Sequence, residues 1–156
     1  MAIRKIIDDK EPLLRKKSRV VEKFDDRLFT LLDDMQATLK KADGAGLAAV
    51  QVGVLKRVFI VDCDEKYGLI ELINPEIVET SGTQTEIEGC LSLPGRQGKT
   101  LRPNYVKIKA QDRYGEWHEY EGTDLLARCF CHENDHLDGI IYTDKLAPGE
   151  KVEFVD

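Results

Sequence analysis

The stretch TDLLARCFCHENDHLDG (residues 123–139) decides the fold, because it has the spacing of one helix that carries a chemical site. Thr123 is a residue type that caps helix starts, and Gly139 is the type that ends them. Leu125 and Leu126 begin an apolar face that continues towards the histidines at helical spacing. The sequence therefore predicts a helix from near Thr123 to near Gly139.

Within this helix, HENDH (132–136) fits the HExxH pattern. His132 and His136 are four residues apart, so they project from one helix face with their β-carbons about 5–6 Å apart and can share one metal ion. Glu133 between them can act as general acid and base. The alternative is a pair of surface histidines that bind nothing. The pattern favours a metal-dependent hydrolase.

A catalytic metal site needs three protein ligands and an open position for water. Only 20 residues follow His136, and they include Pro148 and Gly149, which leaves little room for a helix with a third ligand. The metzincin extension would place a third histidine at the position of Tyr142, so it is excluded. We therefore expect the third ligand from upstream, and a thiolate suits borderline and soft divalent metals.

Among the four cysteines, two fit this role. Cys129 lies three residues before His132 on the same helix face, either as a ligand or as part of the site wall. Cys90, in EGCLSLPG, lies in a segment that could approach the helix as a loop or an edge strand. Cys131 points about 100° away from this face and is expected in the core. Spacing alone does not choose between Cys90 and Cys129.

The segment GAGLAAVQVG (44–53) combines small residues with one amide side chain. Glycines and alanines allow a tight turn or a close approach of the backbone to another group. Gln51 could donate a hydrogen bond to a carbonyl oxygen and polarise it. The alternative is a helix-to-strand turn packed against the core.

Hydrophobic spacing predicts the remaining elements. A helix with one buried face is expected over residues 27–41, capped near Asp25 and Asp26, and strands separated from the helices favour an α+β fold with a largely antiparallel sheet. The turn signals are Asn74 with Pro75, Ser81 with Gly82, and Tyr114 with Gly115. Strands are predicted over 57–63, 69–73, 75–80, 104–111 and 116–121.

The length of 156 residues is typical of one domain, so residues 1–156 are expected to form a single domain. The formal net charge of −6 disfavours direct binding of nucleic acids or anionic membranes. The N-terminus has neither the apolar run of a signal peptide nor the composition of a transit peptide, which predicts a cytoplasmic location. In a reducing compartment, the cysteines are expected to be free thiols or metal ligands.

Taken together, GAGLAAVQ (44–51), EGCLS (88–92) and HENDHLDG (132–139) resemble the motifs of the peptide deformylase family in order and spacing. The opening segment with Pro12, Leu14 and Arg15, and the pair Arg102 and Pro103, are also similar to this family, so the resemblance covers most of the chain. It implies antiparallel sheets packed around a central HExxH helix, with a second long N-terminal helix. It also implies removal of the formyl group from the N-terminal formylmethionine of new polypeptides, with release of formate.

The resemblance assigns a role to each site residue. It implies that Cys90, His132 and His136 bind one divalent metal ion, natively ferrous iron, with zinc, nickel or cobalt accepted. Glu133 would take the proton of the attacking water and later protonate the leaving amine. The remaining roles follow the same source: Gln51 and the backbone N–H of Leu91 would stabilise the formyl oxyanion, and Gly46 and Gly89 would flank the substrate backbone.

The chain departs from the family's usual residues in three places. Cys131 replaces a glutamine outside the metal ligands, Ala45 replaces a larger aliphatic residue, and Arg128 replaces an apolar residue of the methionine pocket, which Leu125 and Cys129 would also line. We expect Arg128 to extend its stem along the pocket and its charge into water. We also expect Arg102 to hold Asp135 and thereby fix the helix.

The expected partners are formylmethionyl peptides of nascent chains, and the resemblance leaves contact with the ribosome open. The chain ends at EKVEFVD without the basic C-terminal helix that some members use on the ribosome, so a short terminal strand is expected instead. A metallopeptidase would share HExxH but would need neither EGCLS nor the Gln51 segment. A relative that binds peptide or metal without turnover is the second alternative. Comparing the turnover of a Glu133→Ala variant with that of the parent would test it, and equal turnover would mean that Glu133 is not the base.

Overall fold

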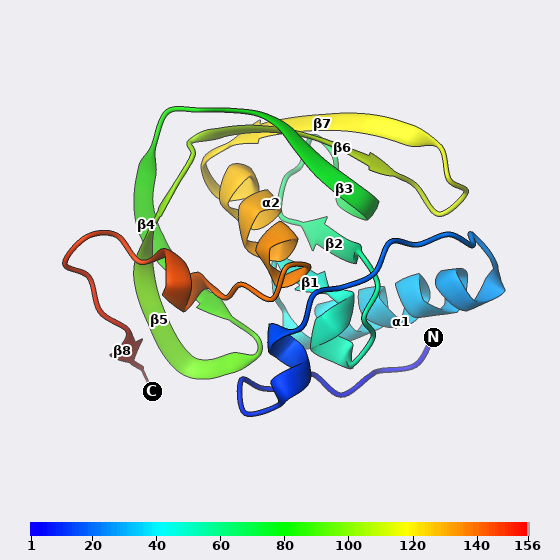
Figure 1. Ribbon diagram of the computed structural model, residues 1–156, viewed down its shortest axis with the longest axis horizontal. Coiled ribbons are helices and arrows are strands. Elements are labelled where there is room, and N and C mark those ends of the chain that lie inside the picture. Colours follow the sequence, from blue (N-terminus) through cyan, green and yellow to red (C-terminus); the bar gives the residue numbers. More distant parts are fainter. Residues whose placement is uncertain (156) are drawn as a thin grey trace.

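The structure, a computed structural model, describes residues 1–155. Two helices and two antiparallel sheets form its framework (Figure 1). The helices are α1 (Asp26–Ala42) and α2 (Asp124–His136). The five-stranded sheet has the order β1 (Gly46–Ala48), β2 (Val58–Asp62), β3 (Leu69–Ser81), β6 (Tyr105–Gln111) and β7 (Trp117–Thr123). The three-stranded sheet has the order β4 (Gln84–Cys90), β5 (Leu93–Arg102) and β8 (Glu153–Phe154). Short 3-10 helices cover Pro12–Arg15, Ala49–Val52 and Tyr142–Lys145.

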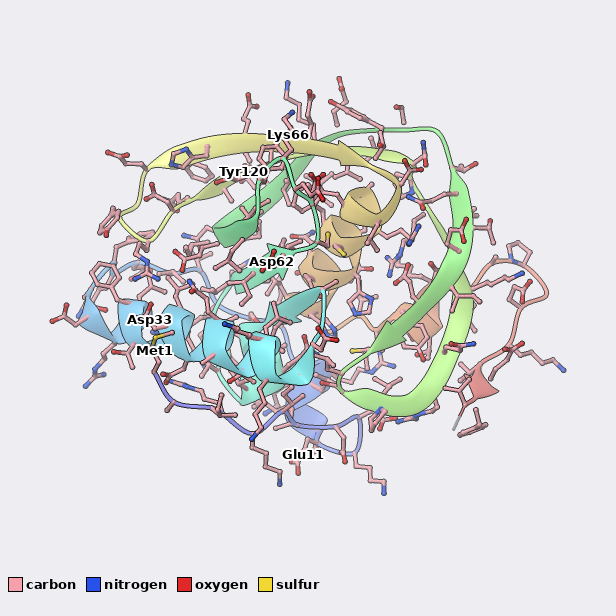
Figure 2. All side chains as sticks on the ribbon, turned by 180° about the vertical axis from the view of Figure 1, so that it is seen from behind. Met1, Glu11, Asp33, Asp62, Lys66 and Tyr120 are labelled. Atoms are coloured by element: carbon pink, nitrogen blue, oxygen red, sulfur yellow. The ribbon has the colours of Figure 1, made fainter. Side chains whose placement is uncertain are left out.

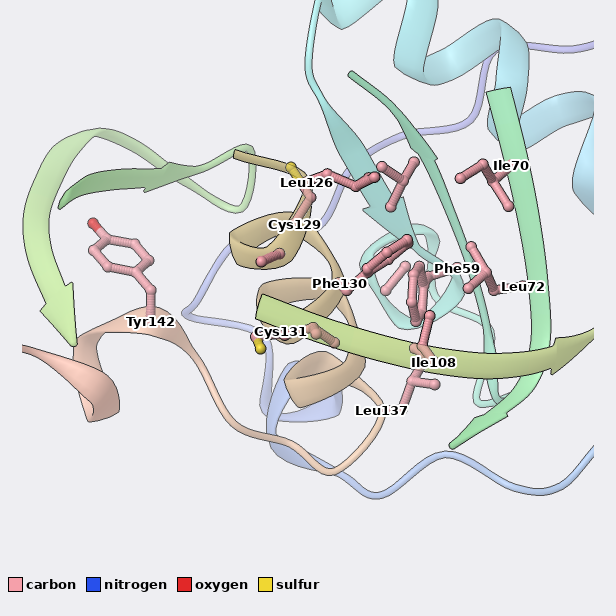
Figure 3. Packing of buried hydrophobic residues seen from close by; sticks show 14 of the residues in the cluster. Phe59, Ile70, Leu72, Ile108, Leu126, Cys129, Phe130, Cys131, Leu137 and Tyr142 are labelled. Atoms are coloured by element: carbon pink, nitrogen blue, oxygen red, sulfur yellow. The ribbon is translucent and has the colours of Figure 1, made fainter. Parts of the chain in front are cut away.

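Helix α2 lies at the centre of the molecule, with the β4–β5 ribbon on one side and the larger sheet on the other (Figure 1). It is buried because its apolar face packs on the inner face of the larger sheet, which supplies alternating apolar residues. This confirms the α+β fold with antiparallel sheets around the HExxH helix. Figure 3 shows Leu126 and Phe130 of α2, and Leu137 directly after it, packed with Phe59, Leu72 and Ile108 of the sheet.

Helix α1 covers the other face of the sheet, and its start matches the predicted cap. Asp25 accepts a hydrogen bond from the backbone N–H of Leu28, which satisfies one free donor of the first turn. The N-terminal segment runs along α1, where the backbone N–H of Ala2 donates to Asp34 at 2.8 Å (Figure 2). The buried face of α1 consists of Leu28, Leu31, Leu32, Met35 and Leu39, which pack with Val58, Ile60 and Ile73.

The predicted turn at Asn74 and Pro75 is wrong, because β3 continues through it as one strand. Asn74 adopts a left-handed conformation with φ 52°, and the register with β6 shifts between Ile73 and Glu76. The Asn74 side chain bonds to both backbone groups of Val21, which stabilises this conformation. A bulge of this kind accommodates a proline inside a strand.

The β4–β5 ribbon was not among the predicted strands. Most side chains of β4 are exposed, so the sequence there lacks the apolar alternation that marks a half-buried strand. The expected short terminal strand is confirmed as β8, which pairs with Arg96 and Gln97 of β5.

Helix α2 begins and ends near the predicted positions, but its first residue is not capped by the predicted hydrogen bond. Thr123 occupies the N-cap position, yet its side chain makes no capping hydrogen bond and instead donates to the Asp124 carboxylate. Gly139 follows the helix with φ 74°, and a Cβ there would lie 2.2 Å from the Arg15 carbonyl oxygen, so only glycine fits. Within residues 1–155, neither helix has the length and apolar character needed to cross a membrane.

Candidate active site

Three candidate metal ligands meet where the end of β4 reaches α2. Ligand atoms of Cys90, His132 and His136 all lie within 4.8 Å of one another, and Cys90 Sγ is 3.4 Å from His136 Nε2. Cys129, the other cysteine considered for this role, is not in this group of ligand atoms, and its sulfur contacts Cys63 Sγ at 3.5 Å. The geometry therefore brings Cys90 to the histidine pair.

The donor set and its spacing fit a four-coordinate divalent metal. Bonds of about 2.3 Å to sulfur and about 2.05 Å to nitrogen at a tetrahedral angle place the two ligand atoms about 3.6 Å apart. The observed 3.4 Å between Cys90 and His136 is close to this value. Three protein ligands leave the open position that a hydrolytic metal site needs for water.

His132 is held by a buried carboxylate. Its Nδ1–H donates to Glu88 Oε1 at 2.9 Å, which leaves Nε2 free to face Cys90 and His136. Burial would raise the pKa of Glu88, but hydrogen bonds from His132 and Arg102 outweigh it and lower the pKa to about 2. Glu88 is therefore ionised at neutral pH and fixes the tautomer of His132.

Arg102 joins this carboxylate to helix α2. Its Nε and Nη2 donate to Glu88 at 3.0 and 3.1 Å, and its Nη1 donates to Asp135 at 2.5 Å. The Arg102 side chain is only 4% exposed, so the expected pair with Asp135 is present and is not an ordinary surface ion pair. Thr100 also donates to Glu88, which completes a buried network across β4, β5 and α2.

Glu133 is buried beside the ligands. Its Oε2 lies 3.9 Å from His132 Nε2, and within residues 1–155 its Oε1 has no hydrogen-bond partner. Burial raises the pKa of Glu133 to about 7, against the opposing effect of the His132 charge. A carboxyl with a pKa near 7 is suited to exchange protons at neutral pH.

The segment 44–53 turns out to be both the expected turn and part of the site. Gly46 in β1 lies against Glu133, because a Cβ at Gly46 would be 2.7 Å from Glu133 Oε2. Gln51 is buried, and its Oε1 accepts from the backbone N–H of Ala48 at 2.9 Å. Its Nε2 lies 3.1 Å from Ser92 Oγ and 3.6 Å from Cys90 Sγ, so the amide is fixed with its donors at the cysteine.

A pocket of about 340 Å³ opens over these groups. Arg128 lines its wall, and its guanidinium donates a hydrogen bond to Gln84 Oε1 at 2.7 Å. The expected contact with water is therefore replaced in part by a contact with a neutral amide. The lining contains all the residues expected to contact substrate, with Gly44, Ile87 and Glu88 added: Gly44, Ala45, Gly46, Gln51, Ile87, Glu88, Gly89, Cys90, Leu91, Leu125, Arg128, Cys129, His132 and Glu133.

Sequence reasoning missed the roles of Glu88 and Ser92. Both lie inside the quoted EGCLS motif, but their partners, His132 and Gln51, are about 40 residues away in sequence. The general need of a metal-bound histidine for a carboxylate partner could have pointed to Glu88. His118, the remaining histidine of the chain, is exposed in β7, and its Nε2 lies 2.8 Å from Asp112 Oδ2.

The remaining two cysteines also agree with the expectations. All four cysteines are free thiols. Cys131 is buried in the hydrophobic cluster around α2 (Figure 3), and burial raises its pKa to about 11. It is therefore an unreactive core residue.

An HExxH helix buried at the centre of an α+β fold, with a cysteine brought to its histidines, defines a metal-dependent amide hydrolase. The family model for polypeptide deformylase matches residues 3–152. The chain is 58% identical to the peptide deformylase of Alkaliphilus metalliredigens, over 94% of this chain and 98% of that one. It is 57% identical to peptide deformylase 1 of Clostridium acetobutylicum, over 96% and 99% of the two chains.

Solved structures agree with these sequence comparisons. The peptide deformylase of Thermotoga maritima superposes with a TM-score of 0.91 at 38% identity, covering 95% of this chain and 100% of that one. The enzyme of Legionella pneumophila superposes with a TM-score of 0.89 at 44% identity, covering 94% and 88%. The chain belongs to the peptide deformylase family. It removes the formyl group from the N-terminal formylmethionine of new polypeptides, which is the activity of that family.

Proposed function

We propose that Cys90, His132 and His136 together hold the metal ion of this deformylase, and that the native ion is ferrous iron, with zinc, nickel or cobalt as substitutes. The observation that carries the proposal is the convergence of one thiol and two imidazoles within 4.8 Å. A bound ion would supply Lewis-acid activation of water and polarisation of the formyl oxygen. One thiolate with two imidazoles suits each of these metals.

Glu133 handles the protons of the reaction. Its unpartnered Oε1 faces no competing donor among residues 1–155, and its pKa near 7 lets it accept a proton from the attacking water. The same carboxyl then donates this proton to the amine of the methionine as the C–N bond breaks. Formate and a free N-terminus are the products.

Gln51 and the backbone N–H of Leu91 stabilise the charge that develops on the formyl oxygen. Gln51 is held by Ala48 and Ser92, so its amide needs no reorganisation when the charge forms. Leu91 follows Cys90 directly in sequence, and both line the pocket. One donor of this kind typically contributes ~3 kcal/mol to transition-state stabilisation.

The substrate backbone lies between β1 and β4, each of which has a free edge in its sheet. Gly46 and Gly89 sit on these two edges, and both line the pocket. An extended peptide can add to such edges by main-chain hydrogen bonds. The methionine side chain then enters the pocket section formed by Ala45, Leu125, Arg128 and Cys129.

Residues 1–156 act as one metallohydrolase domain in the cytoplasm, where nascent formylated chains appear. Contact with the ribosome would place the site near the emerging N-terminus.

The assignment is tested by comparing two cysteine variants after anaerobic purification. Cys90→Ser should lower the bound metal below one equivalent and abolish formate release from formyl-Met peptides. Cys131→Ser, in which the substituted residue lies outside the pocket, should keep one equivalent of metal and its activity. Full metal content in Cys90→Ser would refute the ligand assignment, whereas absence of formate release by the metal-loaded parent would refute the activity.

A further inference from the structure

Two thiols outside the metal site lie in contact. Cys63 follows the last residue of β2, and Cys129 lies on the second turn of α2. Their sulfurs are 3.5 Å apart, although 66 residues separate them in sequence. Neither is among the metal ligands, and the deformylation reaction gives Cys63 no role.

The two cysteines differ in exposure. Cys63 is half-buried, whereas Cys129 is buried between the core and the pocket that binds substrate. In Figure 2, Asp62, the residue before Cys63, lies at the end of β2 beside α2, and these two elements are in contact. A small oxidant can therefore reach Cys63 first, with Cys129 behind it.

We propose that Cys63 and Cys129 form a reversible disulfide when the enzyme meets a hydroperoxide, and that this bond alters the wall of the substrate pocket. A disulfide has an S–S distance of 2.03–2.05 Å, so the sulfurs, now 3.5 Å apart, must approach by about 1.5 Å when the bond forms. Disulfides of reducing compartments are typically transient and redox-sensing.

The hydroperoxide is the oxidant that takes up the two electrons released when the disulfide forms. The Cys63 thiolate attacks the hydroperoxide, which forms an S–O bond, breaks the O–O bond and releases an alcohol or water. The Cys129 thiol then attacks the sulfur of the Cys63 sulfenic acid, the S–O bond breaks, and water leaves with the thiol proton. Two thiols lose two electrons in total, and the hydroperoxide gains them.

The surroundings favour Cys63 as the attacking thiol. The hydrogen bond with Cys129 lowers the pKa of Cys63, against the opposing effects of partial burial and of the Asp64 and Asp62 charges, and the Arg128 charge also acts to lower it. Cys131 offers an internal comparison, since it is buried and has no thiol partner among residues 1–155.

The bond would reach the substrate through Cys129. Because Cys129 lines the pocket next to Arg128, moving its sulfur towards Cys63 changes the surface that meets the methionine side chain. The proposed metal ligands are Cys90 on β4 and His132 and His136 on later turns of α2. We therefore expect a change in KM with little change in kcat. This part rests on the proposed substrate pocket, whereas formation of the disulfide does not.

The test uses nickel-loaded enzyme, so that oxidation of iron does not contribute. Protein treated with hydrogen peroxide is denatured, alkylated and digested, and its peptides are identified by mass spectrometry. We expect two of the four thiols to be lost, a linked peptide containing Cys63 and Cys129, a raised Tm, and full reversal by dithiothreitol. The linked peptide should be absent from Cys63→Ser and present in Cys131→Ser.

Recovery of Cys63 and Cys129 as free thiols, or of Cys63 as a sulfinic acid, would overturn the proposed disulfide. KM for a formyl-Met peptide should change at least twofold on oxidation of the parent and stay constant on oxidation of Cys63→Ser. An unchanged KM in protein shown to carry the disulfide would overturn the proposed effect on the substrate pocket. It would not contradict the proposed metal ligands and catalytic residues.

Discussion

Replacing Arg102 by alanine tests the buried network behind the metal site. Arg102 is 4% exposed and its partner Glu88 is 6% exposed, so the substitution leaves a buried carboxylate without its counter-charge. Breaking a buried ion pair from one side typically costs about 3–5 kcal/mol in free energy of unfolding. Because Glu88 also holds His132, metal affinity should fall by about 10- to 100-fold, the usual effect of losing such support.

Urea denaturation at a fixed free zinc concentration measures the first effect, and competition with a chromophoric chelator measures the second. Arg96→Ala is the matched control, because Arg96 pairs with Asp9 where both side chains are 25–29% exposed. It should lose no more than about 1 kcal/mol and keep its metal affinity. Arg102→Lys should have a stability and a metal affinity between those of the parent and Arg102→Ala, since lysine keeps the positive charge but cannot make the bidentate hydrogen bonds to Glu88. An Arg102→Ala variant as stable and as tight for metal as Arg96→Ala would refute the reasoning.

Three further predictions concern single groups. Glu133→Ala should reduce kcat by about 10²- to 10⁴-fold while metal content stays at one equivalent; parental turnover would show that Glu133 is not the base. Arg128→Leu should lower KM for formyl-Met peptides, because it restores an apolar wall, and an unchanged KM would place Arg128 outside the methionine pocket. The pKa of Glu88 falls from 4.5 to about 2 on folding, so its stabilisation is complete above pH 4.5 and is lost as the pH falls towards 2. Acid titration of metal-free protein should show this slope, on the order of 3 kcal/mol, and Glu88→Gln should remove it.

The sequence predicts α2 and the closeness of its two histidines well because the signal is local. Two histidines and a glutamate within five residues need only helical geometry to come together, and both helix ends lie within a few residues of the predicted ones. The five-stranded sheet was also largely predictable, since its inner strands alternate or are continuously apolar.

The rest depends on contacts between distant segments. The β4–β5 ribbon exposes most of β4, so its residues show no periodic signal. The bulge at Asn74 requires knowledge of Val21, 53 residues away, which accepts and donates its hydrogen bonds. Sequence spacing could not decide whether Cys90 or Cys129 is the third candidate ligand, and only the resemblance to a family favoured Cys90. In the structure, Cys90 lies with the two histidines.

The close contact between Gly46 and Glu133 constrains how the pocket can be redesigned. Any side chain at position 46 would first displace the Glu133 carboxylate, which we propose as the proton carrier, since a Cβ there lies 2.7 Å from its oxygen. Attempts to broaden or narrow substrate preference must therefore leave this glycine unchanged. Ala45, Ile87 and Arg128 line the same pocket, and they are positions at which an engineer can vary its shape without the close contact that Gly46 makes with Glu133.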